Sequence, residues 1–382
     1  MLALHCEPPH KVAMRTLLAC VAASVALLAP LSSARPAAVH PAITAEQSIA
    51  TIDRALTDAA AKGFGGAIII EQSGRTLLSK GYGFADRERR IPFTTETVAQ
   101  IGSITKSQTA AALTTLIAEG KVKLSDPVSK FIPEAPEPGR SRTVAQLASH
   151  SSGLLDSCTD DFEPQSEAML ISTCLARPLE HPVGEDHYSN LGYSVLALIV
   201  QRVTGKPWEE ALGERVWAPL GMKDIGFHFR GVSDDQFSRG YLKNVEQPII
   251  SREIAKLHGS DWALRGNGGI QASSRTMIRF LDGILDPNGG FPPAARKILL
   301  SPVPGQSGEV QEGFGLAFRY EADGTPIRMG HAGSDGTFFS YLGWLRKNDV
   351  RLYLVGNNGA DEVKPLVQLA LKQALQIPAA AK

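Results

Sequence analysis

Strand patterns at both ends of the chain, separated by a long helical stretch, constrain the fold more than any other feature. The apolar runs 67–70 and 76–78 flank Ser73-Gly74, a two-residue hairpin signal. Near the C-terminus, further strands are predicted at 315–318, 326–329, 338–345 and 350–355, followed by a helix at 362–375. The economical interpretation is an α/β fold in which one antiparallel sheet is built from both ends of the chain.

Helical patterns fill the middle of the sequence. Thr44 to Gln47 is a capping box that opens a first helix, and a strong helix is predicted from about Ser103 to Glu119, ending at Gly120. Another follows over 193–203. The predicted sheet domain therefore comprises 42–97 and 312–378, and a mainly helical domain, 98–311, is inserted between its halves.

Composition excludes several classes of protein. Of 382 residues, 43% are hydrophobic and 20% are charged, which are values of a globular protein and not of a disordered or coiled-coil chain. The 39 basic residues balance 39 acidic ones, and no basic stripe offers the electrostatic surface that nucleic-acid binding needs. The 36 glycines and 24 prolines are slightly more than average usage, which fits a loop-rich α/β enzyme and not a helical bundle.

The N-terminus has the layout of a secretory signal. Lys11 and Arg15 precede the apolar stretch 17–29, and small residues at 32–34 form a cleavage site. This stretch is too short to span a bilayer, so no stable membrane span is expected after cleavage at 34. The start is either Met1 or Met14. We expect the protein to be exported, to the periplasm or out of the cell.

Two cysteines, Cys158 and Cys174, remain after removal of the signal. In an oxidising compartment they either form a disulfide or stay as two free thiols. No metal-ligand spacing such as C-x-x-C or H-E-x-x-H occurs, so no metal site is predicted. The acidic residues of 156–163 form either an ordinary exposed loop or one side of a cleft.

Ser103 and Lys106 are the first candidates for catalysis. Spaced three residues apart at the start of a predicted helix, they share one face. Serine is a poor nucleophile without an adjacent base, and lysine becomes such a base when its pKa is lowered. The helix start also directs backbone N–H groups toward developing negative charge. The alternative is an ordinary helix start with a surface lysine.

Two further motifs follow in order along the chain. Tyr188-Ser189-Asn190 combines a phenol, which can move protons, with an amide, which can bind both a lysine and a substrate carbonyl. The segment 330–336, Gly-His-Ala-Gly-Ser-Asp-Gly, falls between two predicted strands, and its glycines allow a substrate to approach the backbone. Taken singly, each has an ordinary structural explanation.

Together these motifs resemble the serine β-lactamase and penicillin-binding protein superfamily, in particular its class C β-lactamase-like branch, which includes esterases and D-aminopeptidases. Segments 123–128, 147–154 and 268–273 resemble the framework of the same superfamily. The resemblance covers about residues 45–375. It implies a β-lactamase/transpeptidase-like fold, in which an antiparallel sheet is flanked by helices.

The resemblance also implies a role for each matching residue. Ser103 is the acylated nucleophile, Lys106 its proton acceptor, and Tyr188 completes the base and later activates the deacylating water. Asn190 holds Lys106 and the substrate. The backbone N–H groups of Ser103 and Ser334 are expected to form the oxyanion hole, and His331 and Gly333 to bind substrate. No cofactor is implied.

His331 departs from the pattern of the β-lactamases and D,D-peptidases of this branch, which usually carry lysine there. A histidine is mostly neutral at neutral pH, and Ala332 lacks the hydroxyl that would bind a substrate carboxylate. The esterase and D-aminopeptidase members carry histidine-x-glycine. The sequence therefore favours a serine hydrolase of small esters, amides or D-amino-acid peptides. The alternatives are a β-lactamase or D,D-carboxypeptidase, and a catalytically silent recognition protein.

Overall fold

The computed structural model describes residues 44–229 and 233–380, which all belong to one compact unit of the chain, Ile43–Lys382. The predicted secretory signal, 1–34, lies outside these residues. In the part of the chain that is described, no helix has the length and apolar character needed to cross a membrane. The predicted division into a sheet domain and a helical domain stays a prediction.

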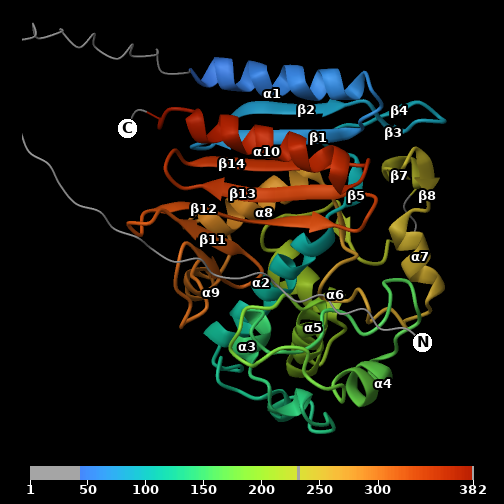
Figure 1. Cartoon of the computed structure of the whole chain (residues 1–382), viewed down its shortest axis with the longest axis vertical. Helices are drawn as coiled ribbons and strands as arrows, with labels where there is room; N and C mark the ends of the chain where they lie inside the picture. The colour runs from blue at the N-terminus through green and yellow to red at the C-terminus, as the bar shows by residue number, and fades with distance from the viewer. Residues whose placement is uncertain (1–43, 230–232, 381–382) are drawn as a thin grey trace, which may run out of the picture. The chain divides into compact units, whose positions relative to one another are not determined.

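A seven-stranded antiparallel sheet is the centre of the fold (Figure 1), with the order β10-β11-β12-β13-β14-β1-β2. As predicted, strands from the two ends of the chain are neighbours, because β1 pairs with β14. The strands of this sheet are β1 (Gly66–Gln72), β2 (Arg75–Tyr82), β10 (Val310–Glu312), β11 (Ala317–Tyr320), β12 (Pro326–Ser334), β13 (Phe339–Leu345) and β14 (Val350–Gly356).

The remaining strands form small sheets beside the large one. One of them has three strands, in the order β5-β9-β6, and its strand β5 comes directly before the segment that carries Ser103. These shorter strands are β3 (Phe84–Asp86), β4 (Ile91–Pro92), β5 (Val98–Gln100), β6 (Ile225–Gly226), β7 (Gly240–Leu242), β8 (Val245–Gln247) and β9 (Gln271–Ser273).

Helices cover both faces of the large sheet. The helices α1 and α10 pack on one face, and α8 packs on the other (Figure 1). The ten α-helices of the described residues are α1 (Ala45–Ala60), α2 (Thr105–Ala118), α3 (Val144–Ala148), α4 (Glu167–Met169), α5 (Asn190–Thr204), α6 (Trp208–Leu212), α7 (Ile250–Lys256), α8 (Ser274–Leu285), α9 (Pro293–Leu299) and α10 (Ala360–Gln376).

The side chains of β1 alternate between the two faces of the sheet, and this explains why helices are needed on both faces. Ile68 and Ile70 are buried with residues of α1 and α10, whereas Ala67 and Ile69 belong to the core on the opposite side. Successive strand residues point to opposite faces, so a strand that is apolar at every position requires cover on both. Each fully buried aliphatic side chain contributes about 1.5–3 kcal/mol to folding.

Local signals set the boundaries of several elements. The predicted capping box is present, since the side-chain oxygen of Thr44 accepts a hydrogen bond from the backbone N–H of Gln47, and the side-chain oxygen of Gln47 accepts one from the backbone N–H of Thr44. Ser73 and Gly74 both have positive φ, as the short hairpin between β1 and β2 requires. The helix predicted over 193–203 begins earlier, at Asn190, because the side chain of Ser189 caps it.

Candidate active site

Ser103 and Lys106 face one another at the start of α2. Ser103 lies in a short 3-10 turn, Gly102–Ile104, and Lys106 lies in the first turn of the α-helix that continues from it. The Nζ of Lys106 is 3.2 Å from the Oγ of Ser103. The three-residue spacing therefore gives the contact that the sequence predicts.

Burial changes the acidity of Lys106. Its side chain is fully buried, because α2 is itself buried along nearly its whole length. This desolvation lowers the pKa of Lys106 to about 7, while the carboxylates of Asp156 and Asp161 act in the opposite direction. A large fraction of the amine is neutral at neutral pH, so Lys106 can accept a proton there.

The hydrogen bonds of Lys106 leave one position for that proton. Its Nζ donates to the Oδ1 of Asn190 at 2.6 Å and to the backbone carbonyl of Asn267 at 2.9 Å. A neutral amine keeps two N–H groups and one lone pair, and the third direction is toward Ser103. The two fixed acceptors therefore direct the lone pair of Lys106 at the hydroxyl of Ser103.

Sequence reasoning missed Asn267, because a backbone carbonyl leaves no signal in side-chain identity. The segment 268–273, which resembles the family framework, starts one residue later. The amide of Asn267 is held by the hydroxyl of Ser194 and the carbonyl of Ala263. These contacts fix the loop whose carbonyl accepts from Lys106.

Tyr188 lies beside the same amine, in the loop that precedes α5. The Nζ of Lys106 is 4.7 Å from the centre of its ring, and the hydroxyl of Ser103 is its hydrogen-bond partner. The ring stacks on His150 with centroids 4.5 Å apart, a second contact that sequence reasoning missed. Partial burial raises the pKa of Tyr188, so its phenol is neutral at neutral pH and can donate a proton.

Asn190 is the first residue of α5, and both the oxygen and the nitrogen of its side-chain amide form hydrogen bonds. The Oδ1 of Asp156 accepts from the backbone N–H and from the Nδ2 of Asn190, at 3.2 and 3.0 Å. This orientation directs the Oδ1 of Asn190 toward Lys106. The first residue of the acidic segment 156–163 therefore contacts the candidate site.

The Cys158 and Cys174 side chains form a disulfide close in sequence to this acidic segment, with an S–S distance of 2.07 Å. It joins the loop after Asp156 to the short helical segment 170–174. Of the two alternatives that the sequence left open, the structure has the bonded one.

His331, Gly333 and Ser334 all lie on β12, so the prediction that their segment falls between two strands is wrong. A run of glycines with histidine and alanine has low strand propensity, but β13 pairs with β12 through Ser334. Pairing with a neighbour has overridden local propensity. The consequence for the site is a straight, extended backbone beside Ser103.

Close backbone contact explains the glycines on either side of the site. A Cβ on Gly333 would come within 1.9 Å of the carbonyl of Ile101, and a Cβ on Gly102 within 2.5 Å of the backbone nitrogen of Ser334. Gly102 also has a φ of +53°, which glycine adopts without strain. The backbones of Ser103 and Ser334, the predicted oxyanion donors, therefore lie close together.

His331 carries little charge at neutral pH. Desolvation, with a smaller effect from Lys106, lowers its pKa to about 4. Its Nδ1 lies 2.5 Å from the carbonyl of Ala332, so this nitrogen carries the proton of the neutral ring. The side chain supplies a hydrogen-bonding group to the cleft and no fixed positive charge.

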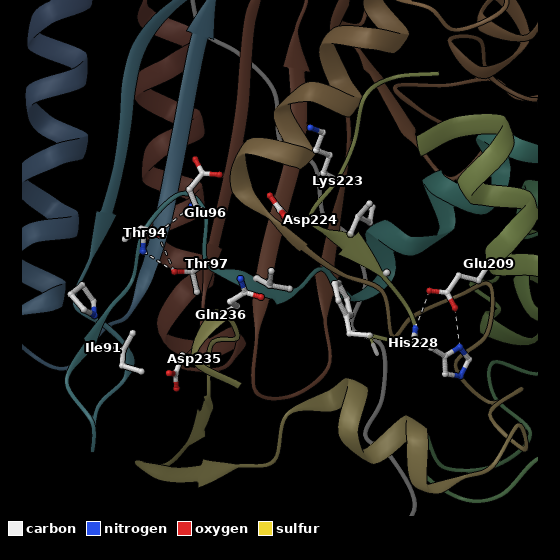
Figure 2. Close-up of a pocket in the computed structure, with 15 residues that line it drawn as sticks. Ile91, Thr94, Glu96, Thr97, Glu209, Lys223, Asp224, His228, Asp235 and Gln236 are labelled. Carbon is white, nitrogen blue, oxygen red and sulfur yellow. Dashed lines mark hydrogen bonds and ion pairs between the residues drawn. The ribbon is translucent and has the colours of Figure 1, made fainter. Parts of the chain in front are cut away.

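Two cavities of similar size differ in their chemistry. One, of about 570 Å³, is lined by Ser103, Tyr188 and His331. The other, of about 660 Å³, has none of the predicted site residues in its lining, and His228 and Glu209 lie at one side of it (Figure 2). No cluster of metal-ligating side chains occurs among the residues that the structure describes. The nucleophile identifies the smaller cavity as the candidate active site.

Sequence comparison identifies the family to which the chain is similar. The model of the Beta-lactamase family matches residues 52–374. The putative penicillin-binding protein PbpX of Bacillus subtilis is 28% identical over 226 residues, which cover 59% of this chain and 56% of that protein. Protein flp of Staphylococcus aureus (strain MW2) is 28% identical over 197 residues, or 49% of this chain and 40% of that one. The chain thus spans about half the length of these curated relatives.

Solved structures agree on the fold. A penicillin-binding protein homologue from Pyrococcus abyssi, described as octameric, has a TM-score of 0.67 at 25% identity, covering 84% of this chain and 77% of that one. A class C β-lactamase from Rhodobacter sphaeroides has a TM-score of 0.69 at 19% identity, covering 86% and 98%. With the family model matching most of its length, this chain belongs to the Beta-lactamase family of serine hydrolases.

Proposed function

We propose that this protein is an exported serine hydrolase that acts through an acyl-enzyme on Ser103, on small esters, amides or peptides containing D-amino acids. One observation carries the proposal. The buried amine of Lys106 has a pKa near 7, and its two hydrogen-bond acceptors direct its lone pair at the hydroxyl of Ser103. A catalytically silent recognition protein has no chemical need for this arrangement.

Acylation begins when the Oγ of Ser103 attacks the substrate carbonyl and its proton passes to Lys106. The carbonyl oxygen becomes negatively charged and binds the backbone N–H groups of Ser103 and Ser334. As the bond to the leaving group breaks, Tyr188 gives its proton to the departing oxygen or nitrogen and recovers one from Lys106. The leaving group departs neutral, and the acyl group remains on Ser103.

Deacylation reverses these proton movements. A water molecule attacks the acyl carbonyl and loses its proton to Tyr188 and Lys106. The bond to the Oγ of Ser103 then breaks, this oxygen takes the proton back, and the acid is released. Both steps use only side chains and backbone groups of this chain.

The absence of a fixed charge at His331 favours esters and aminopeptidase substrates over β-lactams. A neutral imidazole beside Ala332 offers a carboxylate neither a permanent cation nor a hydroxyl at this position. The β-lactamase or D,D-carboxypeptidase alternative needs such a group close to the scissile bond. Export is supported by the disulfide between Cys158 and Cys174, a bond that persists in oxidising compartments.

The test is the ratio of two specificity constants. We expect kcat/KM for p-nitrophenyl butyrate to exceed that for a chromogenic cephalosporin, and both signals to vanish in Ser103→Ala. A larger value for the cephalosporin would show that another group binds its carboxylate and would favour the β-lactamase alternative. Activity no greater than that of Ser103→Ala would favour the silent recognition protein.

A further inference from the structure

Tyr188 takes part in both steps of the proposed mechanism, yet it lies in an exposed loop. Every residue of 182–188 is exposed, and Tyr188 itself keeps 40% of its surface accessible to solvent. The helix α5 begins two residues later, at Asn190. An exposed loop alone does not hold a side chain at the fixed place, beside Ser103 and Lys106, that proton transfer requires. The contacts of Tyr188 with buried residues outside the loop therefore decide where its phenol lies.

His150, in the loop that follows α3, contacts three consecutive residues of the segment around Tyr188. Its backbone carbonyl accepts from the N–H of His187 at 2.7 Å. Its ring stacks on the ring of Tyr188, with centroids 4.5 Å apart and planes inclined by 28°. Its Nδ1 accepts from the backbone N–H of Ser189 at 3.1 Å. The residues before and after Tyr188 are thus bound to the same histidine that packs on its ring.

His150 is itself fixed in the core. Its side chain is buried, and its ring also contacts Tyr193 of α5, with centroids 5.2 Å apart. The hydroxyl of Tyr193 donates to the carbonyl of Ala148, two residues before His150, at 2.9 Å. The loop after α3 is therefore joined to α5 by more than one contact. A buried side chain whose own position is fixed in this way is a rigid support for an exposed loop.

The backbone of His150 has a φ of +56°, in the left-handed region that residues other than glycine rarely adopt. Asparagine, aspartate and histidine are the commoner exceptions. This turn of the chain allows the carbonyl and the ring of His150 to face the same segment, 187–189. Such conformations persist where surrounding contacts hold them, and they are frequent at functional sites. The contacts of His150 with Tyr188 and its neighbours explain why the turn is present.

The hydrogen bond to the Nδ1 of His150 requires a neutral ring. A nitrogen that accepts from the N–H of Ser189 carries no proton, so the proton of the ring is on Nε2. Burial, with smaller effects from Lys106 and His331, holds the pKa of His150 well below its ordinary value. The ring is therefore neutral over the pH range in which Lys106 acts as a base, and its contacts persist there.

We infer that His150 is a positioning residue for catalysis, which holds the phenol of Tyr188 beside Ser103 and Lys106. The inference rests on the proposed function and adds a residue to it. His150 does not line the cavity at Ser103, so it acts through Tyr188 and not on the substrate. The alternative is that His150 is an ordinary buried residue of the framework segment 147–154. In that case its loss would lower activity only as far as it lowers the folded fraction.

The experiment uses two esters whose leaving groups differ in their need for a proton. p-Nitrophenolate is a stable anion and leaves p-nitrophenyl butyrate without one. Phenol, which like the tyrosine side chain has a pKa of about 10, needs a proton from Tyr188 when it leaves phenyl butyrate. Both esters form the same butyryl enzyme, and kcat/KM reports only its formation. The ratio of kcat/KM for p-nitrophenyl butyrate to that for phenyl butyrate therefore measures how well Tyr188 delivers its proton.

We expect this ratio to rise about tenfold in His150→Phe, which keeps a ring beside Tyr188 but has no acceptor for the N–H of Ser189. His150→Asn tolerates the positive φ and places an oxygen where the Nδ1 was, so it removes the stacked ring alone and should raise the ratio by a smaller factor. Ser149→Ala is the matched control, because it removes a buried residue's hydroxyl whose hydrogen bonds stay within 145–151. It should leave the ratio unchanged. Because each ratio is measured within a single variant, a general loss of activity or stability does not affect it.

A double-mutant cycle separates positioning from general effects. Tyr188→Phe removes the phenol and should raise the ratio at least as much as His150→Phe does. In the double variant His150→Phe/Tyr188→Phe we expect no further rise, because His150 then has no phenol to position. A rise of the same size with and without the phenol would overturn the inference, and so would an unchanged ratio in both His150 variants.

Hydrogen exchange makes the inference independent of turnover. The backbone N–H groups of His187 and Ser189 are bonded to His150, and the second loses its acceptor in His150→Phe. Peptides that cover this segment should therefore exchange about tenfold faster in His150→Phe, and at the rate of the wild type in Ser149→Ala. Equal exchange in all three proteins would overturn the inference.

Failure of the proposed function gives a different result. If Ser103→Ala hydrolyses both esters as the wild type does, the nucleophile lies elsewhere and the proposed function fails. The exchange measurement still decides whether His150 holds the segment around Tyr188. If instead Ser103→Ala is inactive and the ratio does not change in either His150 variant, the proposed function stands and only the inference is overturned.

Discussion

The Nζ of Lys106 donates to the Oδ1 of Asn190 at 2.6 Å, and the Oδ1 of Asp156 in turn accepts from the amide nitrogen of Asn190. This chain of contacts holds an amine that burial has made weakly basic. Burial lowers the pKa of Lys106, and its hydrogen bonds orient the lone pair of the amine toward Ser103. A lysine needs both the lowered pKa and this orientation to act as the base of Ser103.

The pH dependence of acylation should report Lys106. Because the neutral amine is the base, kcat/KM should fall as pH decreases through about 7, the pKa of Lys106 in this structure. The raised pKa of Tyr188 keeps its phenol protonated, so we expect no second loss of activity up to about pH 9. A profile of kcat/KM for p-nitrophenyl butyrate checks both limbs. A flat acidic limb would contradict the role of Lys106.

Substitution of Gly102 should damage the oxyanion hole. In Gly102→Ala, the new Cβ would come within 2.5 Å of the nitrogen of Ser334, so Ser103 and Ser334 must move apart. We expect kcat to fall by about a hundredfold, as for the loss of one oxyanion donor. Gly120→Ala is the matched control, since Gly120 also has positive φ but nothing lies within 4 Å of its added Cβ. Equal losses in both variants would indicate backbone strain alone.

A lysine at position 331 should change the substrate specificity. His331→Lys supplies a cation next to the nucleophile, where a carboxylate close to the scissile bond can reach it. We expect penicillin turnover to increase, by about tenfold in kcat/KM. His258→Lys adds the same charge at an exposed position outside the cavity and should have no effect. No gain in the first variant would show that position 331 does not decide between substrates.

The sequence predicted the sheet because its apolar strands and turns are local signals. It also predicted the contact of Ser103 with Lys106, which follows from helix geometry alone. The carbonyl of Asn267, which accepts from Lys106, was beyond sequence reasoning, because a backbone group leaves no signal in side-chain identity. The stacking of His150 on Tyr188 depends on how two loops that are distant in sequence pack together. Long-range register and packing, and not propensity, determine this part of the site.

The disulfide should contribute substantially to stability. It closes a loop between residues 16 positions apart in the sequence, which corresponds to about 3 kcal/mol in the chain-entropy model. The free energy of unfolding of Cys158→Ser/Cys174→Ser should be lower by about this amount in urea titrations. Reductant should destabilise the wild type to the level of the variant and leave the variant unchanged. If the wild type is equally stable with and without reductant, the disulfide contributes little to the free energy of unfolding.

His228 should make stability depend on pH, away from the active site. Its Nδ1 lies 2.9 Å from Glu209, a contact drawn in Figure 2, and its Nε2 lies 2.9 Å from the buried Asp261. The hydrogen bond with Asp261, followed by that with Glu209, raises the pKa of His228 to about 9. The protonated ring is thus favoured in the folded state, and we expect a contribution of about 3 kcal/mol, from the difference to the ordinary pKa of about 6.5.

Because this pKa is raised, the contribution is fully present below about pH 6.5 and is lost as pH rises through about 9. Urea unfolding of the wild type and of His228→Gln across this range measures it. The difference in unfolding free energy should be largest near pH 6 and should shrink toward about pH 10. A difference that stays constant with pH would mean that His228 stabilises the fold through packing and hydrogen bonds that do not require its charge.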